Sequence, residues 1–214
     1  MLSIKLIKSV IFVAAAAAIG LSSQANAVGQ GDWLMRFGAV SVNPNDSSGQ
    51  VGAIAGSGVS VNSSQGLFLN VTYMLRDNIG LELLAATPFS HDITATGAIA
   101  GLGKIAEVKQ LPPTFSVQYH FSPKSDFRPY VGGGINYTTF FSEKTTGATV
   151  TSISLDDSWG LAVQAGFDKD ISKDWFFNAD LRYIKIKTTA TTNVGNVDVT
   201  IDPWVISLGV GTRF

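Results

Sequence analysis

Cysteine is absent from this chain, and charged residues make up only 14% of it. Without cysteine, neither disulfide bonds nor thiolate metal sites nor cysteine nucleophiles are available. Soluble domains contain about 25% charged residues, so this sequence has few of the side chains that normally cover a water-exposed surface. The formal net charge of −1 provides no basic excess, which argues against nucleic acid as a partner.

Long apolar runs are also missing. The run at 10–21 is too short for a membrane-spanning helix, which needs about 20 apolar residues. Lys5 and Lys8 precede this run, and Ala25-Asn26-Ala27 follows it. A basic start, a short apolar segment and an Ala-x-Ala site predict a secretory signal peptide over residues 1–27 that is cleaved on export. The mature protein is then expected to comprise residues 28–214 as one domain.

The mature sequence is nevertheless apolar, since the mean hydropathy of the chain is +0.24. An exported chain that is apolar and has no spanning helices fits a transmembrane β-barrel, in which all backbone groups are paired between strands. We therefore expect an all-β protein located in the outer membrane of a Gram-negative bacterium, with membrane lipid around it.

Alternation of apolar with small or polar residues supports this expectation. It is clear over 67–75, 114–121, 158–167 and 204–214, and weaker segments begin at Trp33, Ile79, Phe127 and Trp175. Successive side chains of a strand point to opposite faces, so each segment predicts a strand with one apolar face. Eight antiparallel strands result.

The connectors alternate between short and long. Residues 76–78, 122–126 and 170–174 are short polar turns, whereas 44–65, 89–106, 143–156 and 188–199 are longer and rich in Gly, Ser, Thr and Asn. This pattern predicts short periplasmic turns and longer extracellular loops. Aromatic residues near the strand ends predict two interfacial girdles: Trp33, Tyr73, Phe121, Phe127, Tyr137, Trp159, Phe167, Trp175, Trp204 and Phe214.

A soluble barrel with an apolar interior is the alternative. In such a barrel, Arg36, Glu82, Asp180 and the other charged residues that alternate with the apolar positions would lie on the outer wall. Turning these residues inward gives each a partner of opposite charge, which favours the membrane barrel.

Several segments resemble the OmpW family of small outer-membrane proteins. They are IGLELLAATPF at 79–89, LPPTFSVQYHF at 111–121, FRPYVGGGINYTTFF at 127–141, DSWGLAVQAGF at 157–167 and DPWVISLGVGTRF at 202–214. The resemblance covers the whole mature chain in order. It implies an eight-stranded barrel with a narrow apolar lumen that passes small hydrophobic molecules into or across the outer membrane. It also implies that the terminal Phe214 is similar to the signal that the outer-membrane assembly machinery recognises.

Strand parity predicts two layers inside the barrel. A polar floor near the periplasmic end is expected from Arg36, Glu82, His120, Arg128, Asp180, Arg182 and Arg213. An apolar cup above it, which would bind ligand, is expected from Val40, Leu84, Ala86, Phe140, Ile184 and Ile186. Charges in so confined a space require partners, so we expect Arg182 to reach Asp180 or Glu82.

The resemblance adds that Leu84 matches a leucine at the family's lumen constriction. Arg182 departs from it, because a bulky apolar or aromatic residue is expected there. A fully dry constriction is therefore in question. A barrel filled by packing side chains, serving as a structural or adhesive protein or a surface receptor, remains the alternative function.

Pro88, Pro112 and Pro113 lie near the loop-side ends of two neighbouring strands. Proline donates no hydrogen bond to a ladder, so these residues suggest a lateral exit from the cup into the membrane. Strand ends alone would explain them equally well.

No enzyme, cofactor or metal site is expected. The two histidines, His91 and His120, have no cysteine companions, and no Ser/His/Asp set appears. The glycine-rich segments 101–106 and 131–136 fall in an expected surface loop and a strand, so neither fits a phosphate-binding loop.

A bacteriocin or a phage is a further expected partner of the surface loops.

Overall fold

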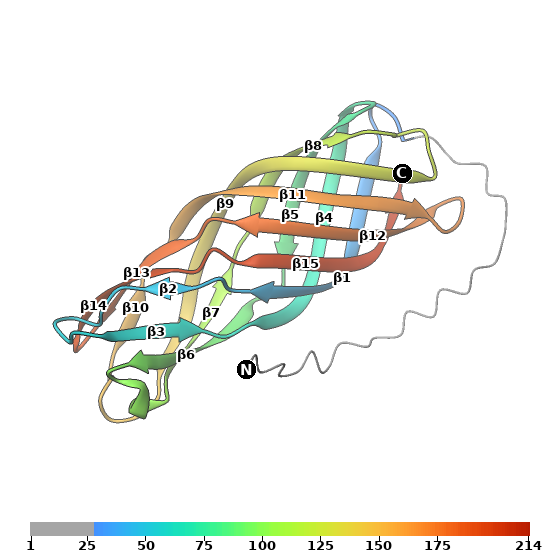
Figure 1. Ribbon diagram of the computed structural model, residues 1–214. Coiled ribbons are helices and arrows are strands. Elements are labelled where there is room, and N and C mark those ends of the chain that lie inside the picture. The colour runs from blue at the N-terminus through green and yellow to red at the C-terminus, as the bar shows by residue number, and fades with distance from the viewer. Residues whose placement is uncertain (1–27) are drawn as a thin grey trace, which may run out of the picture.

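The computed structural model describes residues 28–214. The expected signal peptide, residues 1–27, lies outside the described residues. Eight antiparallel strands close into a barrel within this part of the chain (Figure 1): β1 (Trp33–Asn43), β4 (Ser64–Arg76), β5 (Ile79–Ala86), β8 (Thr114–His120), β9 (Phe127–Thr145), β11 (Ser158–Asp170), β12 (Trp175–Ile184) and β15 (Trp204–Arg213). Each strand pairs with its neighbours along this order, and β15 pairs with β1. No helix of the described residues is long and apolar enough to cross a membrane.

The alternation in the sequence places side chains as expected. On β11, Trp159, Leu161 and Val163 are exposed, whereas Ala162 and Gln164 between them are buried. Tyr137 and Trp159 stack across β9 and β11 near the loop end, with ring centroids 4.8 Å apart. Trp33 and Tyr73 form a similar pair at the other end. An apolar outer wall bounded by aromatic rings matches the hydrocarbon layer of a membrane.

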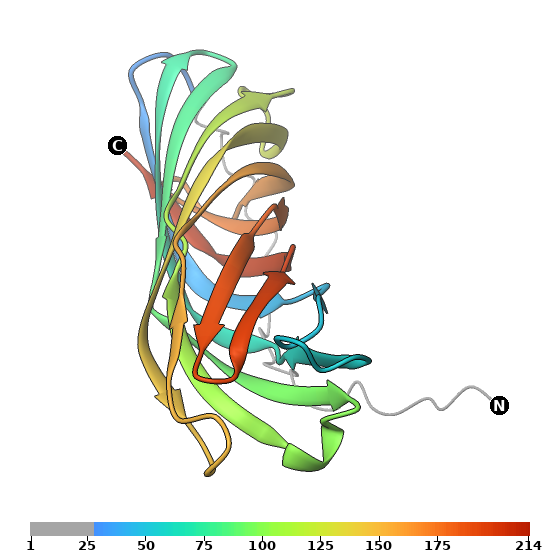
Figure 2. The same ribbon diagram turned by 90° about the vertical axis from the view of Figure 1, so that its left-hand side faces the viewer.

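The longer connectors all lie at the end of the barrel opposite to the short turns, as predicted. Most of the four long connectors are strands that continue the barrel beyond the membrane (Figure 1): β2 (Ser47–Ser48), β3 (Ser57–Val61), β6 (Phe89–Gly97), β7 (Lys104–Leu111), β10 (Ile153–Leu155), β13 (Lys187–Thr192) and β14 (Gly195–Thr200), with a 3-10 turn η1 (Ala100–Leu102) between β6 and β7. We call these elements the extension. Figure 2 shows it end-on, with the β6–β7 hairpin in green and the β13–β14 hairpin in red.

The extension forms because its strands carry apolar residues on their inner face. Ile93 and Ala95 of β6 and Val197 and Val199 of β14 are buried. Their outward neighbours, such as Ser90, Asp92 and Asp198, are polar. The polar outer face places the extension in water, above the aromatic girdle at Tyr137 and Trp159. Composition suggested loops because threonine and glycine are common there, but threonine also suits a strand.

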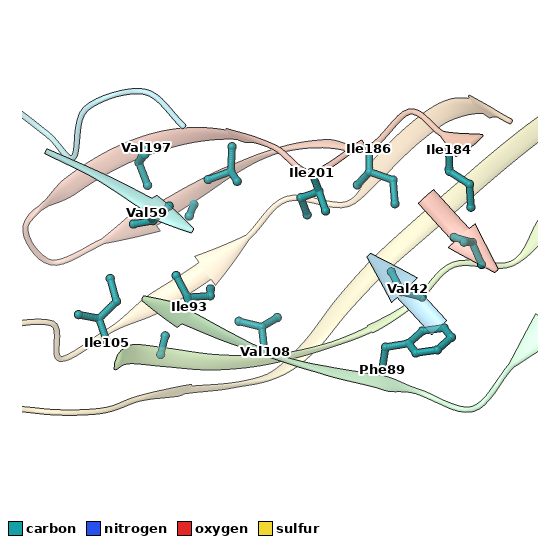
Figure 3. Packing of buried hydrophobic residues seen from close by; sticks show 14 of the residues in the cluster. Val42, Val59, Phe89, Ile93, Ile105, Val108, Ile184, Ile186, Val197 and Ile201 are labelled. Atoms are coloured by element: carbon teal, nitrogen blue, oxygen red, sulfur yellow. The ribbon is translucent and has the colours of Figure 1, made fainter. Parts of the chain in front are cut away.

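A continuous hydrophobic core runs from the upper barrel into the extension. It joins Val42, Ile184 and Phe89 near the barrel mouth to Ile93, Val108 and Val197 farther out (Figure 3). Side chains of β1 and β12 in the barrel and of β6 and β14 in the extension therefore belong to one core, although these strands are distant in sequence. A second small cluster of Val28, Leu34, Met74 and Phe176 lies at the short-turn end.

Candidate hydrophobic lumen and cavity

Arg36 on β1 lies at the centre of the lower lumen and is completely buried. Its Nε and Nη2 donate to the two carboxylate oxygens of Asp168 at 2.9 and 2.7 Å, and its Nη1 donates to Thr72 Oγ1 at 2.8 Å. Such two-pronged pairing is the strong form of an arginine–carboxylate interaction. It fixes β1 to β11 through the interior of the barrel.

Arg182 on β12 pairs with both carboxylates expected from the sequence. Its Nη2 is 2.8 Å from Glu82 Oε1 and 3.4 Å from Asp180 Oδ1. Arg182 also donates to Gln164. Glu82 of β5 and Arg182 of β12 are both buried and face the lumen.

Glu82 gathers several donors besides Arg182. Asn70 and Gln118 donate to its Oε2 at 2.9 and 2.8 Å, and Gln164 donates to its Oε1 at 3.2 Å. A buried carboxylate needs such partners to offset its loss of hydration. Glu82 thus joins strands β4, β5, β8, β11 and β12 in one network.

The remaining floor residues lie closer to the short-turn end. Arg128 Nη2 is 2.6 Å from Asp170 Oδ1, and Arg213 Nη2 is 3.6 Å from Asp170 Oδ2. The His120 ring lies 5.3 Å from that of Tyr130 and is completely buried. All seven residues predicted for the polar floor are therefore inside the barrel wall.

The sequence analysis missed Asp168 and Asp170. Both continue the inward parity of β11 after Gln164 and Gly166, but residue 170 was assigned to a turn and Asp168 was left out. Extending the alternation of β11 by three residues would have found them. Tyr130 and Asn178, also missed, bond to each other at 3.0 Å within the same network.

The predicted apolar cup is not an open space. Val40, Leu84, Ile184 and Ile186 are all less than 7% exposed and belong to one packed cluster, against which Ala86 and Phe140 are partly buried. These side chains fill the bore above the floor. The expectation of an open cup at this level is wrong, because β-branched and leucine side chains from opposite walls meet across so narrow a barrel.

A cavity of about 370 Å³ lies farther out, inside the extension. Of the six residues predicted for the cup, only Phe140 lines it. The other walls come from β3, β6, β7, β10, β13 and β14 and the loops between them, with apolar contacts such as Val59, Ile93, Ile105 and Val197. This size suits a small organic molecule. The sequence alone did not place it because its walls come from segments read as loops.

The barrel wall has a break between β5 and β8. Their ladder ends at the pair Leu84–Thr114, and the ladder of β6 and β7 begins at Phe89–Gln110. The segments 85–88 and 111–113, which hold the three prolines, do not pair with each other between these points. The prolines thus lie where the sequence placed them, at neighbouring strand ends.

Each edge of this break is bonded to its outer neighbour. Thr87 N donates to Leu67 O at 2.8 Å on one side. Asn136 Nδ2 donates to both Pro112 O and Pro113 O at 3.1 Å on the other. These bonds hold each edge of the break to the strand on its own side.

A closed eight-stranded barrel with an apolar outer wall and a charged interior defines a small outer-membrane protein. The profile described as the OmpW family matches residues 29–214. The chain belongs to the OmpW family, as the sequence resemblance predicted.

Known proteins agree with this assignment. The chain is 49% identical to outer membrane protein W of Vibrio cholerae over 195 residues, which cover 86% of this chain and 89% of the relative. The crystal structure of OprG from Pseudomonas aeruginosa superposes with a TM-score of 0.84 at 39% identity, covering 88% of this chain and 98% of OprG. The dibenzothiophene metabolism operon protein PahQ of Pseudomonas aeruginosa is 25% identical over 85% of this chain and 88% of PahQ. The protein is thus located in the outer membrane.

Proposed function

We propose that this protein admits small hydrophobic molecules through the cavity of its extension and releases them sideways into the outer membrane. The cavity is the observation that carries the proposal. An apolar space of about 370 Å³ above the membrane offers such a molecule an apolar site before it enters lipid.

The polar floor supports sideways release. Arg36, Arg182 and their carboxylates fill the lower lumen with paired charges, and an apolar molecule would have to displace these pairs to pass through. Transfer of an apolar solute past paired, hydrogen-bonded charges is unfavourable. The route toward the periplasm is therefore the less favourable one.

The break beside Pro88, Pro112 and Pro113 supports the same direction. Gln110, which lines the cavity, also forms the last residue pair before the break. No ladder bond joins segments 85–88 and 111–113, so none is broken when the two segments separate. The name of the relative PahQ places it in an operon of dibenzothiophene metabolism, and an apolar aromatic compound of this kind fits the proposed class of solute.

The test compares cells that contain the protein with cells that lack it. Uptake of a small apolar probe should be faster in cells with the protein, whereas uptake of a small sugar should be unchanged. Equal uptake of the apolar probe would contradict the proposal and favour a structural or adhesive barrel.

The lateral step is tested by restoring backbone donors at the break. Replacing Pro88, Pro112 and Pro113 together by valine supplies three N–H groups with which the edges can pair. We expect slower uptake with unchanged probe binding to the purified protein. Pro123→Val, in the turn at the opposite end of the barrel, is the matched control. Unchanged uptake in the triple variant would contradict lateral exit.

A further inference from the structure

Gln110 and His91 form a polar pair on the otherwise apolar cavity wall. Both side chains are at least 96% buried, and both line the cavity. They lie on β7 and β6 and contact each other through Gln110 Nε2 and His91 Nε2 at 2.9 Å. The remaining polar residues of the wall are threonines.

The hydrogen bonds define the state of this pair. His91 Nδ1 is 2.7 Å from the backbone oxygen of Asn62. A carbonyl oxygen only accepts, so Nδ1 carries the proton. Burial lowers the pKa of His91, which keeps the ring neutral and leaves Nε2 as an acceptor. Nε2 therefore accepts from the Gln110 amide nitrogen.

This arrangement leaves the other end of the Gln110 amide unused. Its Oε1 is buried and has no hydrogen-bond partner among the described residues. A buried acceptor without a partner is destabilising, because it has lost its hydrogen bonds to water. The bond to His91 uses the amide nitrogen, so the amide oxygen is the atom that has no hydrogen-bond partner.

The pair also lies on the proposed route. Gln110 is opposite Phe89 in the last residue pair before the wall break. A molecule that leaves the cavity toward the break passes this residue. The acceptor is thus placed between the apolar site and the membrane.

We propose that Gln110 selects apolar molecules that carry one hydrogen-bond donor, such as a hydroxyl group, over equally apolar molecules that carry none. The donor bonds to Gln110 Oε1 while the hydrocarbon part fills the cavity. This inference rests on the proposed function, because it assigns the class of solute to the same cavity.

The experiment uses the mature protein in lipid nanodiscs and two probes of equal size, 1-octanol and heptyl methyl ether. Methyl resonances of Ile93, Ile105 and Val108, which line the cavity, report binding of either probe. We expect the wild-type protein to bind the alcohol more tightly than the ether by about 2- to 12-fold, the range of one neutral hydrogen bond.

The double variant Gln110→Leu/His91→Leu should abolish this preference while still binding both probes, because it removes the His91 Nε2 acceptor that Gln110→Leu alone would leave free. Comparing the alcohol-to-ether ratio between proteins in identical nanodiscs cancels partition of the probes into lipid. Thr188→Val is the matched control, because the Thr188 hydroxyl lines the cavity but already donates to Asp156 O at 2.7 Å. It should keep the wild-type ratio.

A second measurement does not depend on folding of a variant. The side-chain amide signal of Gln110 in the wild-type protein should shift with the alcohol and stay in place with the ether. If neither probe perturbs the cavity methyl groups, the proposed function fails. If both bind with equal affinity, or if the preference persists in Gln110→Leu/His91→Leu, the selection by Gln110 is overturned while the proposed function stands.

Discussion

Arg182 and Glu82 are 100 residues apart in the sequence, yet Arg182 Nη2 and Glu82 Oε1 lie 2.8 Å apart inside the barrel. The two side chains are 1% and 0% exposed. Their bond spans the bore between β12 and β5, which do not pair with each other. This ion pair therefore links two non-neighbouring strands across the lumen, in addition to the hydrogen bonds between neighbouring strands.

Arg182→Leu should destabilise the barrel by about 3–5 kcal/mol, because it removes the nearest counter-ion of the buried Glu82. The double variant Arg182→Leu/Glu82→Leu should lose less than the sum of the two single variants. The measurement is denaturant unfolding of the detergent-solubilised protein.

Lys169→Met is the control for this cycle, since the Lys169–Asp126 pair is about half exposed and such pairs contribute little. Strict additivity of the Arg182 and Glu82 variants would show that the pair has no energetic coupling.

Phe140→Asp should weaken binding of an apolar probe and leave the barrel assembled. Phe140 lines the cavity and is only partly buried, so a carboxylate there makes the site polar while retaining some contact with water. Leu84→Asp should instead reduce the amount of folded protein, because Leu84 is 6% exposed in the packed bore. Probe binding and the gel shift of the folded barrel on heating distinguish the two effects. Equal behaviour of the two variants would contradict the separation of bore from cavity.

Phe214→Ser should lower the yield of assembled protein without destabilising the assembled barrel. The Phe214 side chain is 70% exposed, while its backbone exchanges hydrogen bonds with Trp33 at 2.9 and 3.1 Å. The backbone bonds survive the substitution. Pulse-labelled cells should show normal synthesis and export with less folded protein in the outer membrane.

Ile171→Ser, which also removes an exposed apolar side chain, is the control for assembly. Unchanged assembly in Phe214→Ser would remove the role assigned to the terminal residue.

Acid should loosen the β6–β7 hairpin. Burial lowers the pKa of His91 below its ordinary value of 6.5, and the hydrogen bond to the Asn62 backbone and the nearby Asp92 only partly oppose this effect. Above about pH 6.5 the ring is neutral in both the folded and the open state. Below that pH the open state binds a proton that the folded state excludes, so the free energy of opening falls as pH falls.

Hydrogen exchange of the β6 and β7 amides, corrected for its intrinsic pH dependence, measures this opening. In His91→Gln, the corrected exchange rates of these amides should no longer depend on pH. An acid-induced change of equal size in that variant would assign the effect to another group.

The sequence by itself determined the barrel and the sides of its wall. Alternation of period two fixes which side chains face lipid and which face the lumen, because successive residues of a strand point in opposite directions. Arg36, Glu82 and Arg182 could thus be placed inside, and their need for partners followed from the cost of a buried charge. The three short turns indicated three pairs of neighbouring strands, on either side of 76–78, 122–126 and 170–174.

The tertiary structure decided where empty space lies. Parity shows that Val40, Leu84 and Ile184 point inward, but it does not show whether facing side chains meet or leave a gap. That depends on the radius of the barrel and on contacts between strands far apart in sequence. In the bore they meet, and the cavity opens only in the extension, where β6, β7, β13 and β14 pair as hairpins beyond the membrane.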